Sequence, residues 1–182
     1  MNFPKRYADR VAKLRVPGGF VMVAAFAWFS HPTPRSLAWG LPVSLAGLAL
    51  RAWAAGNLRK DSVLTTAGPY SLVRNPLYVG TLLAAAGFAA ASASWPLALL
   101  FAAVFLLIYL PVIGLEEQHL RDLFPGFAEY ATQVPRLFPS LLFTSQTPQF
   151  HFALYRKNRE YEAGLGFFAG ALLLTAKSFY RF

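Results

Sequence analysis

An Arg-Asn-Pro sequence, Arg74-Asn75-Pro76, directly precedes a long apolar run. Asparagine favours the N-cap position and proline the first helical position, so we expect a helix to begin here. The unpaired N–H groups and positive dipole of a helix N-terminus suit a carboxylate or a phosphate. The alternative is a structural entry into an apolar layer, with Tyr70 and Tyr78 as interfacial aromatic residues.

Two adjacent acids, Glu116 and Glu117, follow the apolar residues. We expect their helix to continue to Phe124, because carboxylates are unfavourable at a helix C-terminus. Adjacent side chains on a helix point about 100° apart, so one acid can bind a ligand while the other pairs with an arginine. The alternative is an ordinary acidic boundary in which Glu117 pairs with Arg121, four residues later.

The histidines and cysteines give little support to a metal centre. Glu116-x-x-His119 has the spacing of di-iron helical bundles, but those sites need a second such motif and further carboxylates. His31 and His151 have no companions of that kind, and the chain contains no cysteine. We therefore predict no metal site, no disulfide and no cysteine nucleophile.

The composition favours lipid over water around these polar residues. Of 182 residues, 56% are hydrophobic and 14% are charged, whereas soluble domains usually carry about 25% charged residues. The net charge of +9 would suggest nucleic acid in a soluble protein. Here the basic residues lie between apolar runs, where membrane topology and anionic headgroups explain them better. We predict no nucleic-acid partner.

The apolar runs predict an all-α integral membrane bundle with a tight helical hairpin. Leu77–Leu115 contains no charged residue and would form a helix about 58 Å long, twice the thickness of the hydrocarbon core, which is about 30 Å. It must fold back at Ser92–Pro96, where Ser94 can cap the next helix. Met1–Arg15 is expected to be an interfacial helix. The five predicted spans are Val16–Ser30, Leu37–Ala55, Leu77–Ala93, Trp95–Leu115 and Gly164–Tyr180. The last of these contains Lys177 and could instead lie in the interface.

The basic residues predict the orientation of this bundle. With a cytoplasmic N-terminus, 13 Lys and Arg residues lie inside, and only Arg35, Lys177 and Arg181 lie outside. Arg51 lies about one turn from the cytoplasmic end of its span, where snorkelling to the interface explains it as well as a functional role does. By the positive-inside rule, both polar segments, Gly56–Pro76 and Glu116–Glu162, are cytoplasmic. We therefore expect a multi-pass protein whose functional pocket opens to the cytoplasm.

These motifs together resemble the superfamily of isoprenylcysteine carboxyl methyltransferases and phospholipid methyltransferases. The matching elements are Gly68-Pro69-Tyr70-x-x-Val73-Arg74-Asn75-Pro76-x-Tyr78-x-Gly80, the apolar hairpin, Glu116-Glu117-x-x-Leu120-x-x-x-Phe124, and Tyr130-x-x-x-Val134-Pro135-Arg136-x-x-Pro139. The resemblance implies one domain over residues 1–182. Its catalytic core is residues 57–139, and residues 140–182 form a C-terminal extension that contains the last membrane helix.

The resemblance implies that S-adenosylmethionine (SAM) is the cofactor and assigns residues to its pocket by position. The implied cofactor-binding residues are Arg74, Asn75, Pro76, Tyr78, Gly80, Glu116, Glu117, Tyr130 and Val134. The candidate catalytic residues are Glu117 and Arg136, the latter in a segment that closes over the pocket. Methyl transfer from a sulfonium needs alignment and exclusion of water and requires no metal. The face of Tyr78 can stabilise the sulfonium by a cation–π contact.

The expected reaction is methyl transfer to a lipophilic acceptor embedded in the membrane. A carboxylate acceptor is already ionised at neutral pH, whereas an ammonium must first lose a proton. An amine acceptor therefore needs a base that works at neutral pH, and His119 is the one evident candidate. This scarcity of bases favours a carboxylate over a phospholipid amine. A second possibility is a membrane reductase of the steroid-reductase type, which uses NADPH and shares the Arg-x-Pro-x-Tyr-x-Gly stretch. A third is a membrane scaffold without catalytic activity.

Overall fold

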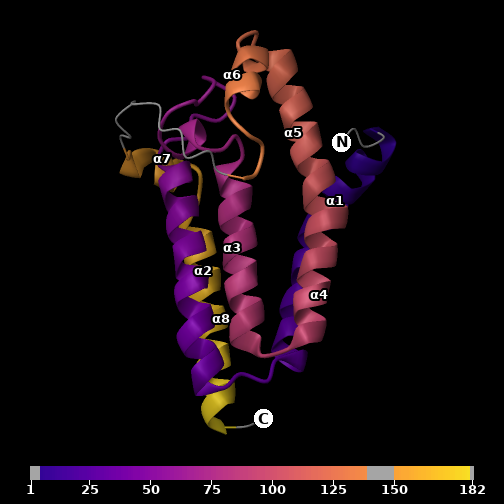
Figure 1. Ribbon diagram of the computed structural model, residues 1–182, viewed down its shortest axis with the longest axis vertical. Helices are drawn as coiled ribbons and strands as arrows, with labels where there is room; N and C mark the ends of the chain where they lie inside the picture. The colour runs from indigo at the N-terminus through magenta and orange to yellow at the C-terminus, as the bar shows by residue number, and fades with distance from the viewer. Residues whose placement is uncertain (1–4, 139–149, 181–182) are drawn as a thin grey trace.

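The computed structural model describes residues 5–138 and 150–180, and within these ranges the chain is helical, with no strand. The long helices run side by side along one direction (Figure 1). The elements are α1 (Lys5–Phe29), α2 (Pro34–Ala55), the 3-10 turn η1 (Gly68–Ser71), α3 (Pro76–Ser92), α4 (Trp95–Val104), the π-helical turn η2 (Phe105–Tyr109), α5 (Leu110–Leu123), α6 (Phe127–Gln133), α7 (Phe152–Lys157) and α8 (Tyr161–Tyr180). The predicted all-α membrane fold is confirmed.

Within the described ranges, three helices are long and apolar enough to cross a membrane: α2, the continuous helix Trp95–Leu123 that joins α4, η2 and α5, and α8. Pro17–Phe29 and Pro76–Ser92 are apolar but shorter. The structure therefore supports a membrane protein, and the count of five spans stays a prediction. The helix that begins at Trp95 runs past the paired acids, as expected, and ends at Leu123.

The predicted hairpin is present between α3 and α4. Ala93 adopts a left-handed backbone conformation with φ of 51°, which reverses the chain between the two helices. Ser94 occupies the N-cap position of α4 as predicted, but its side chain makes no capping hydrogen bond. The turn is held instead by its neighbours, because the carbonyl of Ser92 accepts a hydrogen bond from the backbone N–H of His31 at 2.8 Å.

The N-terminal segment that was predicted to be an interfacial helix is continuous with the apolar helix that follows it, and its interfacial position stays a prediction. The chain forms one continuous helix, α1, from Lys5 to Phe29, with Pro17 inside it. Proline removes only one helical hydrogen bond, and the apolar residues on either side of it favour a single helix. Residues 1–4 of the predicted interfacial helix lie outside the described residues.

Small residues let α2 and α3 pack more closely than any other helix pair. A Cβ atom on Gly40 would lie 2.3 Å from the backbone nitrogen of Ala91, and one on Gly47 would lie 2.4 Å from that of Ala84. The Ser44 hydroxyl donates a hydrogen bond to the carbonyl of Ala84 at 2.6 Å. Close backbone approach through small residues is typical of membrane helices, and here it fixes the start of α3 beside the end of α2.

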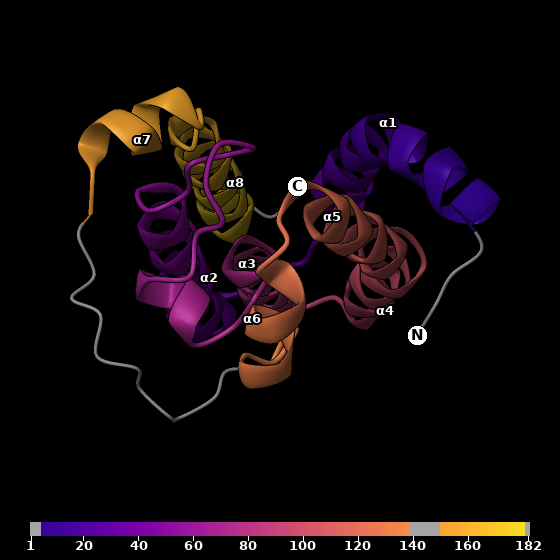
Figure 2. The same ribbon diagram turned by 90° about the horizontal axis from the view of Figure 1, so that it is seen from above.

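The two ends of the bundle differ in chemistry. Trp28, Trp39 and Trp95 are 79%, 73% and 74% exposed, and all three lie near the end that carries the α3–α4 turn. Exposed tryptophans at one level are typical of a membrane–water interface. The opposite end carries α6, α7 and the 56–75 connection, which cover the end of the helices when the molecule is seen from above (Figure 2). The polar residues of interest are therefore collected at one end.

Candidate functional site

A polar pocket of about 690 Å³ lies where α2 ends, α3 begins and α5 passes alongside. Its walls include seven of the residues assigned to the site from the sequence. These are Arg74, Asn75, Pro76, Tyr78, Glu116, Glu117 and Tyr130. Three other assigned residues, Gly80, Val134 and Arg136, are not among the described residues that line it. The structure thus brings most of the predicted site together from α3, α5 and α6.

Glu117 is the centre of the polar network, with only 6% of its surface exposed. Its carboxylate accepts hydrogen bonds from Asn75 Nδ2 at 3.0 Å and from Arg136 Nε at 2.9 Å. Arg74 Nε lies 3.5 Å from the same carboxylate. The alternative in which Glu117 pairs with Arg121 is wrong, because the Arg121 guanidinium lies over the Phe127 ring, 5.7 Å from its centroid. Glu117 therefore joins α5 to the start of α3 and to the closing segment.

Asn75 stands at the N-cap position of α3, but its side chain does not cap the helix. That part of the prediction was wrong. Its amide nitrogen donates instead to Glu117 and to the backbone carbonyl of Arg136, the latter at 3.2 Å. The buried carboxylate is the stronger acceptor, because a charge-assisted hydrogen bond outweighs a neutral one. Asn75 thus connects the start of α3 with both the acid and the closing segment.

The two adjacent acids have different partners, as the helical geometry predicted. Tyr78 donates its hydroxyl hydrogen bond to Glu116 Oε1 at 2.7 Å, whereas Glu117 points toward the arginines. The closing segment is held over this region by a further bond, since the backbone N–H of Arg74 donates to the carbonyl of Pro135 at 2.9 Å. Pro139, the last residue of the predicted motif, lies outside the described residues.

Two buried polar groups of the pocket residues make no hydrogen bond within the described parts of the chain: the Tyr70 hydroxyl and Arg74 Nε. The Tyr130 hydroxyl, by contrast, donates to the carbonyl of Tyr70 at 2.7 Å. Burial raises the pKa of both tyrosines above the ordinary value for a phenol, so both remain protonated. Buried groups of this kind are usually satisfied, so the Tyr70 hydroxyl is available to a polar ligand, whereas Arg74 Nε faces the Glu117 carboxylate at 3.5 Å.

Arg51 and Glu160 form a pair that the sequence reasoning missed. Arg51 Nε lies 2.6 Å from Glu160 Oε1, and Nη2 lies 3.1 Å from Oε2; Nη1 donates to the Thr81 hydroxyl. The sequence left Arg51 open between snorkelling and a functional role, and the structure gives it a carboxylate partner. The partners are 109 residues apart in the chain, so no local pattern links them. The only signal was that a cation within an apolar helix needs a partner.

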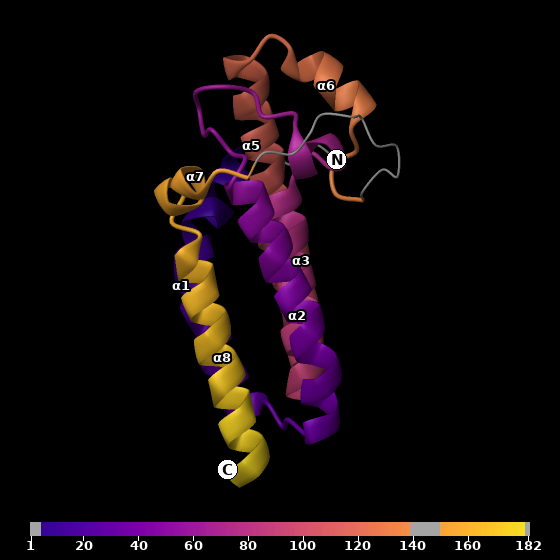
Figure 3. The same cartoon turned by 90° about the vertical axis from the view of Figure 1, so that its left-hand side faces the viewer.

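The C-terminal extension closes one side of the pocket. Asn158 donates to the carbonyls of Ala55 and Leu58 at 2.9 and 3.0 Å and so satisfies the end of α2. Both Asn158 and Glu160 line the pocket. Helix α8 then runs beside α2 along the length of the bundle (Figure 3). The extension is thus part of the same structural unit as the predicted core.

Gly80 lies at a close contact between α2 and α3. A Cβ atom there would lie 2.7 Å from both Arg51 Cγ and the carbonyl oxygen of Gly47. The absence of a side chain at Gly80 is therefore what lets the stem of Arg51 cross α3. Gly80 affects the pocket by placing Arg51.

His119 also lines the pocket, at its exposed rim. Its Nε2 atom lies 3.6 Å from Asp61 Oδ1, and both side chains are more than half exposed. Across the described residues, no group of three or more His, Cys, Asp and Glu side chains is placed to hold a metal ion.

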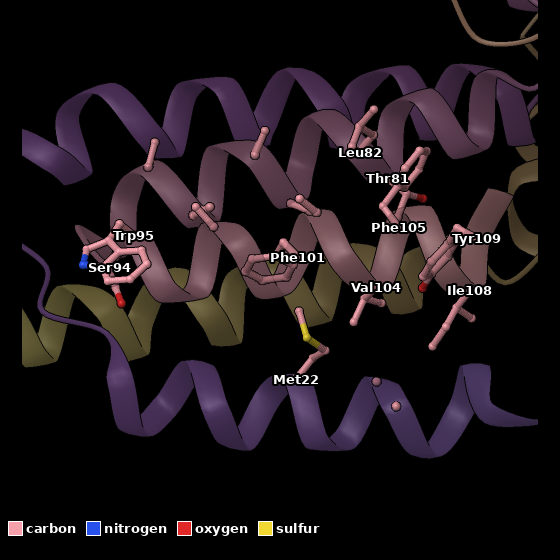
Figure 4. A pocket seen from close by; sticks show the side chains of 18 of the residues that line it. Met22, Thr81, Leu82, Ser94, Trp95, Phe101, Val104, Phe105, Ile108 and Tyr109 are labelled. Atoms are coloured by element: carbon pink, nitrogen blue, oxygen red, sulfur yellow. The ribbon is translucent and has the colours of Figure 1, made fainter. Parts of the chain in front are cut away.

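An apolar groove of about 600 Å³ runs between α1, α3 and α4 (Figure 4). Met22 of α1 and Phe101 of α4 flank its middle, and Trp95 lies at one end. Small residues keep it open. The alanines that line it are Ala85, Ala86, Ala89, Ala90, Ala93, Ala98 and Ala102. At its other end, Thr81 and Tyr109 line both this groove and the polar pocket, so the two spaces meet there.

Comparisons with known proteins agree with this architecture. The model of the phospholipid methyltransferase family matches residues 42–126, which include the hairpin and both acids. The cobalt-zinc-cadmium resistance protein CzcN of Cupriavidus metallidurans is 39% identical over 150 residues, covering 77% of this chain and 67% of that protein. The nickel-cobalt-cadmium resistance protein NccN of Alcaligenes xylosoxydans xylosoxydans is 36% identical over 126 residues, covering 65% of this chain and 59% of that protein.

The chain therefore spans about three fifths to two thirds of the length of these two curated relatives. No solved structure matches it significantly. The Gly68–Gly80 motif, the apolar hairpin and the Glu116–Phe124 motif lie within the family match, whereas the Tyr130–Pro139 motif lies beyond its end. The chain belongs to the phospholipid methyltransferase family, within the superfamily of membrane methyltransferases that includes the isoprenylcysteine carboxyl methyltransferases.

Proposed function

We propose that the protein transfers a methyl group from SAM to a lipophilic acceptor embedded in the membrane. The observation that carries this proposal is the meeting of two unlike spaces, a polar pocket and an apolar groove, at Thr81 and Tyr109. A water-soluble methyl donor and a lipid acceptor need such a junction, because each must reach the other from a different medium. The family of membrane methyltransferases to which the chain belongs supports the same reaction class.

The polar pocket fits SAM in its donor and acceptor groups. SAM carries a carboxylate, an ammonium, ribose hydroxyls and a sulfonium. The pocket offers the Tyr70 hydroxyl as a buried donor that lacks a hydrogen-bond partner in the described chain, and the Arg74 guanidinium as a cation whose Nε faces Glu117. It offers Glu116 as a carboxylate acceptor and Tyr78 as an aromatic ring. When bound, SAM supplies a methyl group whose bond to sulfur breaks as the acceptor's lone pair forms the new bond, leaving a neutral thioether.

The proposed roles follow from these contacts. Arg74 holds the cofactor carboxylate, because its guanidinium lines the pocket and can bind a carboxylate through its nitrogens. Glu116 accepts a hydrogen bond from a cofactor hydroxyl or amino group, since carboxylates form the stronger, charge-assisted hydrogen bonds. Glu117 orients Arg74 through an ion pair and Asn75 through a hydrogen bond. The closing segment, which includes Val134 and Arg136, excludes water from the polar pocket.

The apolar groove is proposed to hold the hydrocarbon tail of the acceptor. From Trp95 to Tyr109 the groove extends about 21 Å at ~1.5 Å per residue, which is most of the hydrocarbon core. Lipid tails are as apolar as the groove walls, so burial by itself gives no gain over the membrane. The groove therefore selects a tail by shape and places its head group at Thr81 and Tyr109.

The chemistry of the acceptor head group stays open between two classes. A carboxylate is our first choice, because it needs no base and His119 lies at the exposed rim of the pocket. A phospholipid amine is the second, favoured by the description of the matched family. The names of the two relatives concern metal resistance and mention no acceptor. We propose that the pocket faces the cytoplasm, as the positive-inside count predicts.

One experiment tests the cofactor. Purified protein in detergent is titrated with SAM and, in parallel, with NADPH. Saturable binding of SAM without binding of NADPH is the expected result. Binding of NADPH alone would support the reductase class, and binding of neither would contradict the proposed function.

A second experiment tests the acceptor. Methyl transfer from labelled SAM is measured with a prenylcysteine analogue and with a methylated phosphatidylethanolamine. Ala89→Phe, which fills the groove, should raise the KM for the acceptor and leave the dissociation constant of SAM unchanged. Equal activity of Ala89→Phe and the wild type at low acceptor concentration would contradict the assignment of the groove.

A further inference from the structure

The helix that carries the paired acids is interrupted by a π-helical turn just below the polar pocket. Its residues are Phe105–Tyr109, and the N–H of Leu110 bonds to the carbonyl of Phe105, five residues back. Pro111 has no N–H, so the carbonyl of Leu107 loses its α-helical donor. The Tyr7 hydroxyl of α1 donates to that carbonyl at 2.9 Å. Proline thus explains the turn, and α1 satisfies the carbonyl that proline leaves.

The π-helical turn ends at Tyr109, which lies at the junction of the two spaces. Tyr109 and Thr81 are the two described residues that line both the polar pocket and the apolar groove. Both are seen at the same end of the groove in Figure 4, opposite Trp95. π-Helical turns are rare and occur frequently at functional sites. The turn at Phe105–Tyr109 sets the angle about the helix axis between Tyr109 and the two acids that follow it, Glu116 and Glu117.

The ring of Tyr109 is held in a fixed orientation by two aromatic neighbours. It stacks on Phe105 with ring centroids 6.1 Å apart and planes 8° apart. It meets Tyr78 edge to face, with centroids 6.0 Å apart and planes 76° apart. Tyr78 is itself oriented by its hydrogen bond to Glu116. Tyr78 and Tyr109 therefore form an aromatic corner, with one ring in the polar pocket and the other at the junction.

We propose that Tyr109 binds the sulfonium methyl of the cofactor at this junction, with Tyr78 as the second ring. The inference rests on the proposed function, since the donor methyl must lie where a head group from the groove can reach it. A ring face attracts a cation, and the attraction is stronger in a site shielded from water. Thr81 completes the junction, but its hydroxyl already accepts from Arg51 and donates to the carbonyl of Leu77. Tyr109 is thus the contact at the junction that offers an electron-rich face.

The test compares SAM with S-adenosylhomocysteine, which lacks the methyl group and the positive charge and is otherwise the same ligand. Calorimetry in detergent measures both dissociation constants. Tyr109→Leu should weaken SAM roughly 2- to 30-fold while leaving S-adenosylhomocysteine unchanged. Tyr109→Phe keeps the ring and should keep the ratio of the two constants. Phe88→Leu is the matched control, because Phe88 packs on Phe26 and Phe167 away from both spaces.

If Tyr109→Leu fails to fold, fluorinated phenylalanines at position 109 replace it. Successive fluorines withdraw electron density from the ring face without changing its shape, so SAM affinity should fall stepwise. Equal weakening of both ligands, or no change in either, would overturn the inference and make Tyr109 a packing residue. Failure of the wild type to bind either ligand would overturn the proposed function as well, so the two failures are distinguishable.

Discussion

Arg51 in α2 and Glu160 just before α8 form a two-pronged ion pair beside the polar pocket. Glu160 is buried, with 6% of its surface exposed, and the pair ties the C-terminal extension to the helix pair α2–α3. This ion pair therefore attaches the C-terminal extension to the core at the wall of the polar pocket.

Removal of one member of this pair should destabilise the protein. Glu160→Gln leaves the Arg51 guanidinium without its counter-charge, which for a buried pair costs about 3–5 kcal/mol of the free energy of unfolding. The double variant Arg51→Gln, Glu160→Gln should recover part of that loss, since no charge is then stranded. Thermal unfolding in detergent measures both. If Glu160→Gln were as stable as the wild type, the ion pair would contribute nothing to the free energy of unfolding.

The close packing of α2 on α3 predicts that a single methyl group is disruptive. Gly47→Ala places a Cβ 2.4 Å from the backbone of Ala84, so the helices must separate. We expect a loss of about 1–3 kcal/mol, as for overpacking of a core. Gly114→Ala in α5 is the matched control, because no atom lies within 4 Å of its Cβ, and alanine is the better helix former. Similar melting temperatures for the two variants would contradict the packing seen here.

The positive-inside count predicts which ends of the helices share a side of the membrane. Arg59 and Pro96 are both exposed and lie at opposite ends of the bundle. Each is replaced singly by cysteine, and the native chain has no cysteine to interfere. Ser92, in the same turn, is fully buried and unsuitable for labelling. An impermeant thiol reagent should label position 59 from the cytoplasmic side and position 96 from the other. Labelling of both from one side would refute the topology.

The two acids should respond differently to loss of charge. Glu116→Gln should weaken SAM binding by about 1.5–3 kcal/mol, because one charge-assisted hydrogen bond is lost at the pocket wall. It should cost less stability than Glu117→Gln, because an amide oxygen at position 116 can still accept from Tyr78. Glu117→Gln should also weaken SAM binding, but with a large loss of stability, because Arg74 and Arg136 lose their shared carboxylate. Calorimetry and thermal unfolding on the same samples separate the two effects. Wild-type affinity in both variants would make the acids structural.

The roles of Arg74 and Arg136 are tested by exchange for lysine, which keeps the charge and loses the planar fork. We expect Arg74→Lys to raise the dissociation constant of SAM. Arg136→Lys should lower turnover and leave that constant nearly unchanged, as predicted for an acceptor-binding residue. Arg136 does not line the polar pocket and pairs with Glu117, so its role with the acceptor remains a prediction. Equal losses of SAM affinity in both variants would contradict the division.

The sequence alone determined the membrane bundle and its family. An uncharged run too long for one span has to fold back, and local turn chemistry at Ser94 and Pro96 marks where. The resemblance to the membrane methyltransferases implied that Arg74, Tyr78, Glu116 and Glu117 share one pocket, and the structure brings them together at the open end of the hairpin. Local rules decide such features, since helix length, turn residues and hydropathy depend on neighbours in the chain.

Only the tertiary structure decided which polar groups meet. Asn75 has the sequence signature of an N-cap, yet it bonds to Glu117, because a buried carboxylate from another helix is a stronger acceptor than the local geometry offers. Glu160 lies outside the recognised motifs, yet it pairs with Arg51 across 109 residues. The junction at Tyr109 depends on how α1, α3 and α4 are arranged in space. Contacts between distant segments leave no periodic pattern in a sequence. These pairings could therefore be found only in the folded structure.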